Sequence, residues 1–148
     1  MKLSLYADYA LRVLMFAGLK GNEDLSTVSE IADHFDISRS HLTKVVHELG
    51  KLGYIETIQG KNGGFRLGKK PKQINIGMVV RKTEKDLAVI GCLQEANYCP
   101  IQPSCVLRRA LNEATNAFLS ILDAYSLEDL LRPSHSLAKL LAIDAAHE

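Results

Sequence analysis

Long apolar runs are missing from this sequence of 148 residues, and none approaches the roughly 18 residues that a membrane-spanning helix requires. The first residues, Met1 to Ser4, are not followed by the apolar stretch and small-residue cleavage site of a signal peptide. We therefore expect a cytoplasmic protein that has no membrane partner.

The sequence also lacks the short motifs that mark many small enzymes. It contains no Cys-x-x-Cys pair, no glycine-rich phosphate loop and no recognisable Ser-His-Asp arrangement. A thiol oxidoreductase using Cys99 and Cys105 is the enzyme alternative, and turnover of a disulfide substrate would reveal it. Hydrophobic residues make up 47% and charged residues 24%, as in soluble globular proteins. We expect one domain or two very small ones, and no catalytic activity.

Positive charge is concentrated in one part of the chain although the net charge is only +1. Residues 37–72 contain eight basic and two acidic side chains, a balance of +6, so the remainder carries −5. A basic segment on a nearly neutral protein suits a phosphate backbone, although solvated loops also carry lysines.

The N-terminal half shows three stretches with helical periodicity. Leu5 to Leu19 form the first, with Ser4 as its N-cap. Thr27 to Glu30 provide a capping box for a short second helix, and Asp36 to Ser38 break the chain before a third helix that ends at Gly53. The pattern predicts two short helices joined by a tight turn.

After Gly53 the apolar pattern changes to that of strands. Tyr54–Ile58 and Phe65–Leu67 flank the glycine-rich segment Gly60–Gly64, and its Asn-Gly pair favours a hairpin because both residues tolerate positive φ. Ile74–Ile76 follow as a brief extended piece, with a short helix from Met78 to Lys82. Three helices and a hairpin in this order predict a winged helix-turn-helix.

The C-terminal part contains a longer helical pattern. Its apolar positions are spaced close to 3.5 residues apart, as in helices that pack lengthwise on each other: Leu107, Leu111, Ala114, Phe118, Ile121 and Tyr125. We interpret it as a dimerisation helix, and burial within its own domain is the alternative. Ser126–Asp129 cap another short turn that stops by Pro133, and the rest to Glu148 is expected to be a weakly attached tail.

The predicted winged helix offers two groups of residues for DNA contact. The N-terminal part of the third helix enters the major groove in such proteins, where Arg and Lys pair with guanine. The wing tip can approach a phosphate or the minor groove through its glycines. The predicted DNA-contacting residues are Ser38, Arg39, Ser40, His41 and Lys44 on the helix, and Lys61, Asn62 and Gly63 on the wing. Ordinary surface exposure is the alternative for each of them.

Three cysteines, Cys92, Cys99 and Cys105, lie within fourteen residues and nowhere else. Their odd number argues against a disulfide framework, and Pro100 and Pro103 keep the segment out of regular helix. Three thiolates in a loop suit an iron-sulfur cluster or zinc with a fourth donor from elsewhere, while three unrelated small hydrophobes are the alternative. We divide the chain into a winged helix at 1–80, a cysteine loop at 81–106, and a dimerisation helix and tail at 107–148.

These residues resemble the iron-sulfur winged-helix repressors of the NsrR/IscR family over most of the chain. The resemblance is carried by Asp8–Arg12, Ile37–Leu42, Gly60–Gly64 and the three cysteines. The segments Arg81–Leu107, Phe118–Leu119 and Leu122–Tyr125 look most like the members that sense nitric oxide.

The resemblance implies a homodimer that binds a palindromic operator, and a 4Fe-4S cluster held by the three cysteines, with 2Fe-2S as the alternative. Some members use a histidine shortly after the third cysteine, but Val106–Arg108 follow here, so that ligand has no candidate. In the members that sense nitric oxide, an aspartate in the first helix of the partner subunit can complete the ligand set, and the resemblance places Asp8 at this position. An acidic side chain that merely stabilises a first helical turn is the alternative for Asp8. Nitrosylation of the cluster would release DNA and derepress nitric-oxide detoxification genes. A zinc or thiol redox switch, or a regulator of iron-sulfur cluster assembly, is the alternative function.

Overall fold

The computed structural model describes residues 2–94 and 98–143, and its first helix is the centre of the fold. Helix α1 (Leu5–Lys20) begins where the Ser4 hydroxyl accepts a hydrogen bond of 3.2 Å from the backbone N–H of Ala7, as predicted. Four helical segments, at residues 39–51, 76–83, 127–131 and 134–140, and the strand at residues 64–67 contact α1. Consequently α1 is apolar on most of its circumference, and seven of its residues are buried.

Helices α2 (Val28–Phe35) and α3 (Arg39–Lys51) form the predicted helix-turn-helix. The capping box is present: Glu30 accepts from the Thr27 backbone N–H at 2.8 Å, and the Thr27 hydroxyl accepts from the Glu30 N–H at 3.2 Å. Asp36 ends α2 in the left-handed conformation at φ 52°, and this bend turns the chain into α3. Helix α3 ends two residues before the predicted Gly53.

The wing consists of antiparallel strands β1 (Ile55–Ile58) and β2 (Gly64–Leu67), in the register Ile55 with Leu67 and Ile58 with Gly64. The hairpin was predicted, but its turn differs from the expected one. Gly60 adopts the positive φ, 117°, and Asn62 and Gly63, both described, do not. Gly63 is needed for another reason, because a Cβ there would lie 2.4 Å from the Ile58 carbonyl oxygen.

Helix α4 (Ile76–Thr83) follows the short 3₁₀ turn Pro71–Gln73. It begins two residues earlier than predicted because the Asn75 side chain caps it, accepting from the Met78 N–H at 3.0 Å. Ile76 is therefore helical rather than extended. Its N–H donates to the Tyr125 carbonyl at 2.9 Å, which ties the start of α4 to the segment after α5.

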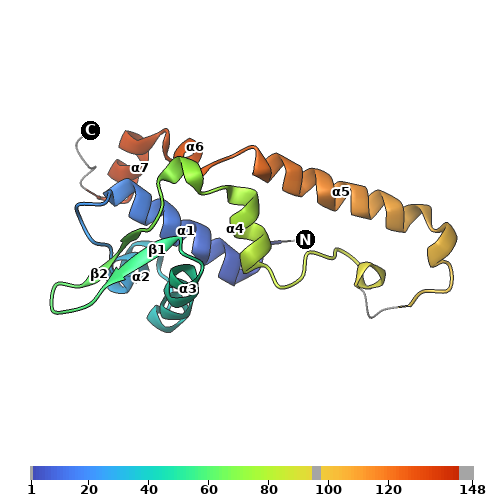
Figure 1. Ribbon diagram of the computed structural model, residues 1–148, viewed down its shortest axis with the longest axis horizontal. Helices are drawn as coiled ribbons and strands as arrows, with labels where there is room; N and C mark the ends of the chain where they lie inside the picture. The colour runs from blue at the N-terminus through green and yellow to red at the C-terminus, as the bar shows by residue number, and fades with distance from the viewer. Residues whose placement is uncertain (1, 95–97, 144–148) are drawn as a thin grey trace.

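Helix α5 (Val106–Asp123) projects from the rest of the molecule as an arm, which we define as residues 84–123 without the undescribed 95–97 (Figure 1). The chain leaves α4, runs outward through 3₁₀ turns at Gly91–Leu93 and Gln102–Ser104, and returns along α5. All of α5 is described, and Leu119 is its one buried residue. At its inner end Asp123 forms a two-pronged ion pair with Arg81 of α4.

The end of the chain corrects one expectation. Helix α6 (Leu127–Leu131) has the predicted cap at Ser126 and ends before Pro133, but residues after it do not form a loose tail. Helix α7 (Ser134–Leu140) contacts α1 and buries Ala138, and Leu141 and Ile143 pack against the core. These apolar residues cover the far end of α1. Residues 144–148 of the expected tail lie outside the described residues.

The fold is mainly helical with a small hairpin wing, which confirms the predicted class. We call the part that packs around α1, residues 2–83 with 126–143, the head. Within residues 2–94 and 98–143, no helix combines the length and the apolar character that spanning a bilayer would demand.

Candidate DNA-binding surface and cysteine segment

One face of α3 points to solvent and the opposite face forms the core. At 100° per residue, Ser40, Lys44, His47 and Lys51 fall on one line along the helix, and all four are exposed. The buried face is the predicted one: Leu42, Val45, Val46 and Leu49. We call the four aligned residues the α3 stripe. They form a polar ridge, and the buried apolar residues on the opposite face of α3 fix its position on the molecule.

The predicted residues at the start of α3 are exposed, but three of them already have partners. Arg39 lies 3.5 Å from Asp33 of α2 in an open ion pair, which leaves its guanidinium free to rearrange at little cost. The hydroxyl groups of Ser38 and Ser40 lie 2.8 Å apart. As far as the described atoms show, the Ser38 side chain accepts no hydrogen bond from a backbone N–H of α3, and its hydroxyl contacts the Ser40 side chain instead.

His41 occupies a different position from the α3 stripe. Its ring stacks on Tyr9 of α1 with ring centroids 6.4 Å apart, on the side of α3 that faces the start of α1. Lys44 and His41 both line the hollow on that side. On the wing, Lys61 and Asn62 are exposed at the tip, while Gly63 is half-buried in the turn. These positions make contact with a duplex feasible, and the roles of the individual residues stay predictions.

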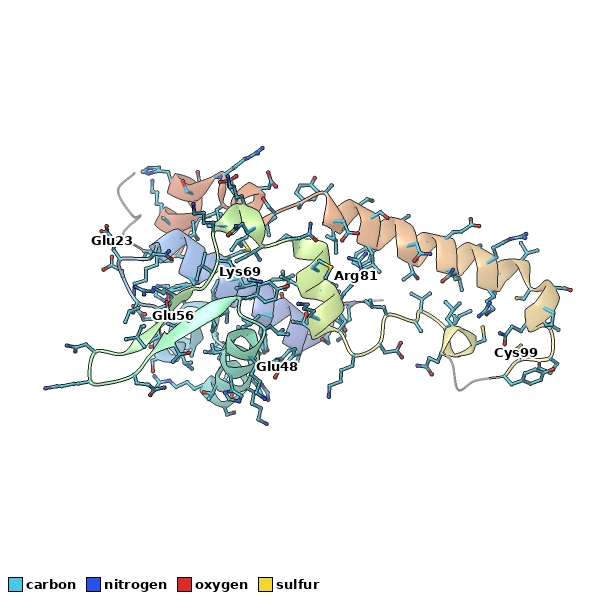
Figure 2. The ribbon with its side chains drawn as sticks, in the orientation of Figure 1. Glu23, Glu48, Glu56, Lys69, Arg81 and Cys99 are labelled. Atoms are coloured by element: carbon cyan, nitrogen blue, oxygen red, sulfur yellow. The ribbon has the colours of Figure 1, made fainter. Side chains whose placement is uncertain are left out.

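The three cysteines lie on the arm. Cys92 belongs to the 3₁₀ turn Gly91–Leu93, Cys99 follows the undescribed residues 95–97, and Cys105 is the N-cap of α5. All three are half-buried free thiols. Figure 2 shows Cys99 at the end of the molecule farthest from the wing.

Arg108 connects two of the cysteine positions. Its backbone N–H donates to the Cys105 sulfur at 3.4 Å, and its side-chain Nε donates to the Cys92 carbonyl oxygen at 3.2 Å. Arg108 therefore holds the Cys92 turn against the first turn of α5. Sequence reasoning missed this residue, since nothing in its spacing distinguishes it from the neighbouring Arg109.

The cysteines have the donor chemistry of an iron-sulfur or zinc site, but they do not converge. Among the described residues, no three His, Cys, Asp or Glu side chains lie together closely enough to hold one metal ion. The described part of a single chain therefore provides the ligand types without an assembled set of three ligands, with or without Asp8.

Asp8, the remaining predicted ligand, lies in the first turn of α1. Its carboxylate binds Arg12 through two contacts of 3.1 Å each. The Arg12 guanidinium also lies over the Phe35 ring, 5.4 Å from its centroid, at the end of α2. The pair was not predicted, although oppositely charged residues four positions apart are neighbours on a helix surface.

Comparison with known proteins decides the family. The family model Rrf2, described as an iron-dependent transcriptional regulator, matches residues 3–133. The chain belongs to the Rrf2 family. It is 53% identical over 142 residues to the HTH-type transcriptional regulator NsrR of Geobacillus kaustophilus, covering 95% of this chain and 97% of that one. It is 49% identical over 143 residues to NsrR of Bacillus licheniformis, covering 96% and 100%.

Solved structures of the Rrf2 type have the same fold. CymR of B. subtilis, the global cysteine regulator, superposes with a TM-score of 0.69 at 25% identity, covering 88% of this chain and 95% of that one. IscR of T. potens gives 0.71 at 19% identity, covering 93% and 90%. The relatives are named as transcriptional regulators, in agreement with the expectation that the protein is not an enzyme.

Proposed function

We propose that the protein is a nitric-oxide-sensing transcriptional repressor that binds a palindromic operator as a homodimer. The observation that carries this proposal is the separation of two surfaces in one chain. The α3 stripe and wing tip lie on the head, and the three free thiols lie on the arm. A DNA-reading surface and a chemically reactive segment at different ends of one molecule are the parts that a ligand-controlled regulator needs.

The second copy has an obvious place to bind. Of the six positions of the predicted apolar seam, four are exposed, among them Leu107 at 63% and Ile121 at 64% relative exposure, and Leu111 and Phe118 are half-buried. A solvated helix with such a face is stabilised by packing on another helix. We propose that α5 pairs with α5 of the second copy, which also places two heads on one duplex.

Cys92, Cys99 and Cys105 fit an iron-sulfur cluster in donor type, and we propose that they hold one of the 4Fe-4S kind. When bound, the cluster supplies iron that reacts with nitric oxide. The fourth ligand proposed is Asp8 of the second copy, an oxygen donor weaker than a thiolate. Asp8 would have to leave or share Arg12, its present partner at 3.1 Å.

Asp8 would then join the head of one copy to the arm of the other. This link would hold the two α3 helices at the spacing of consecutive major grooves, about 34 Å. Without it, the heads would be free to leave the half-site register and affinity for the operator would fall. The residues of the chain thus convert a change at the arm into a change at the head.

The test begins with an anaerobic absorbance spectrum, with iron and sulfide measured before and after titration with nitric oxide. We expect a broad band at roughly 400 nm with about four iron and four sulfide per chain, and bleaching by nitric oxide together with loss of operator binding. Cys99→Ser is expected to remove the band and to leave the folded head intact. A colourless protein with stoichiometric zinc would overturn the nitric-oxide sensor.

Asp8 requires its own variant, because the cluster could persist without it. Asp8→Ala is expected to retain iron and to bind the operator more weakly than the parent before any nitric oxide is added. If the variant binds the operator as the parent does and releases it at the same nitric oxide ratio, the proposed link through Asp8 is wrong.

A further inference from the structure

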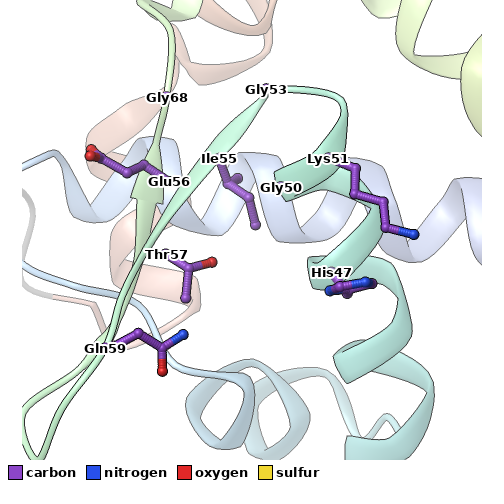
Figure 3. Close-up of a pocket in the computed structure, with 9 residues that line it drawn as sticks. All are labelled: His47, Gly50, Lys51, Gly53, Ile55, Glu56, Thr57, Gln59 and Gly68. Atoms are coloured by element: carbon purple, nitrogen blue, oxygen red, sulfur yellow. The ribbon is translucent and has the colours of Figure 1, made fainter.

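A groove of about 840 Å³ lies between the second half of α3 and strand β1, on the wing side of the α3 stripe (Figure 3). Its α3 wall includes His47 and Lys51, the last two members of the stripe. Its opposite wall includes Thr57 and Gln59. The predicted DNA-contacting residues leave this groove out, because they all lie at the start of α3 or at the wing tip.

The alternation of side chains along β1 decides what faces the groove. Ile55, Thr57 and Gln59 share one side of the strand, and Ile55 is buried at its base while the other two are exposed. Figure 3 shows Thr57 and Gln59 pointing toward the α3 side, where His47 lies. A hydroxyl, a carboxamide and an imidazole therefore face one open space, and each can donate a hydrogen bond.

The acidic residues around the groove are compensated. Glu56 lines it, but its side chain belongs to the other side of β1 and accepts from Arg66 across the hairpin at 3.0 Å. Lys51 lies 3.6 Å from Glu48, an exposed pair that rearranges easily. Among the described lining residues no unpaired carboxylate would repel an anion.

The groove on the other flank of α3 has a different character. It measures about 850 Å³ and combines three acids with three lysines: Glu48, Glu84, Asp86, Lys44, Lys82 and Lys85. An anion entering it would meet both signs of charge. Of the two flanks, the wing side is therefore the better seat for a negatively charged strand.

We infer that the groove between α3 and β1 binds the sugar-phosphate backbone of the duplex, with His47, Thr57 and Gln59 donating to phosphate oxygens. The inference rests on the proposed DNA-binding function. One strand separates a major groove from the next minor groove, so a duplex holding α3 in the first and the wing tip in the second must pass this strand between them. Gln59 is the residue directly before Gly60 at the tip, and His47 lies on the stripe, so the groove continues both surfaces.

Gln59→Glu tests the inference by placing a carboxylate against the phosphates. Its matched control is Gln73→Glu, which adds the same charge on the 3₁₀ turn beside α6, away from α3. Thr57→Val replaces only the hydroxyl with a methyl group of similar size. Binding of each holoprotein is measured by fluorescence anisotropy on a duplex selected from random sequence by the parent and on an unrelated duplex, with melting curves to verify the fold.

We expect Gln59→Glu to weaken binding about tenfold and Thr57→Val about threefold, each by the same factor on both duplexes, because phosphate contacts carry no sequence information. Gln73→Glu should change little. The inference would be overturned if Gln59→Glu and Thr57→Val bound DNA as tightly as Gln73→Glu, or if their affinity fell on the selected duplex alone. DNA binding itself would still be established. Failure of the parent to bind any duplex would instead overturn the proposed function.

Discussion

The head and the arm use the same kinds of apolar side chain in opposite ways. In the head, Leu14, Ile31 and Leu42 have no exposed surface, and they join α1, α2 and α3 into one core. In the arm, Leu107 and Ile121 are more than half exposed. Burial is the main source of folding free energy, so the head carries its own stability and the arm depends on a second surface. A regulator built this way can change the arm without unfolding the part that reads DNA.

The largest effect on folding is expected from a truncation in the head. Ile31→Ala removes a fully buried side chain at the junction of α2 with the core and should lower the free energy of unfolding by about 3 kcal/mol. Val106→Ala, at 65% exposure on the arm, should change it by less than about 0.5 kcal/mol. Chemical denaturation measures both, and similar losses would contradict the contrast between head and arm.

A variant in the arm is expected to prevent pairing of two copies and to leave the head folded. Ile121→Glu places a charge in the exposed seam of α5, so we expect sedimentation to show monomers in place of dimers. Operator affinity should fall about a hundredfold because the two half-sites are no longer bound together. Asn116→Glu, at an exposed position outside the seam of the same helix, is the control. A variant that stays dimeric would show that this face has another role.

A smaller effect is expected within the arm, at Arg108. Arg108→Met removes the 3.2 Å hydrogen bond to the Cys92 carbonyl, so the Cys92 turn should be held less firmly. Outer contacts of this kind tune how well a site retains its metal, and we expect iron to be lost to a chelator about tenfold faster. Arg109→Met is the matched control on the exposed side of α5. Equal rates of iron loss would show that Arg108 does not position Cys92.

Local patterns in the sequence predicted the features of the head that neighbouring residues determine, and missed those that depend on distant contacts. The capping box at Thr27, the buried apolar face of α3 and the hairpin are determined by neighbouring residues, and the structure has all three. The short helix α7 was missed because Ala138 is buried by distant α1, which no local period reveals. The turn glycine was misplaced for a similar reason, since the strand register decides which residue takes the positive φ.

The candidate site shows the same difference between features set by the local sequence and features set by tertiary packing. The residue types and the exposed face of α3 follow from helical spacing, so the ridge of the head was predictable. Convergence of Thr57 and Gln59 on His47 depends on how β1 packs beside α3, and that arrangement is tertiary. The ion pair of Arg81 with Asp123 joins residues 42 positions apart and gives no signal in either local segment.

This ion pair is where the head and the arm meet, and it makes the smallest predicted effect. The hydrogen bond from Arg81 holds the pKa of Asp123 below its ordinary value of 3.8. A folded-state pKa below the unfolded one contributes stability that is complete above pH 3.8 and lost as the pH falls through the folded value. Carboxyl NMR titration should therefore show Arg81→Gln raising the pKa of Asp123. Asp129 is the internal control, because its pKa is lowered by hydrogen bonds from Ser126 and should not move. An unchanged Asp123 titration in Arg81→Gln would mean that the guanidinium does not interact with this carboxylate in solution, and that α4 and α5 are joined by other contacts, among them the 2.7 Å hydrogen bond from the Asn75 side chain to the Asp123 carbonyl oxygen.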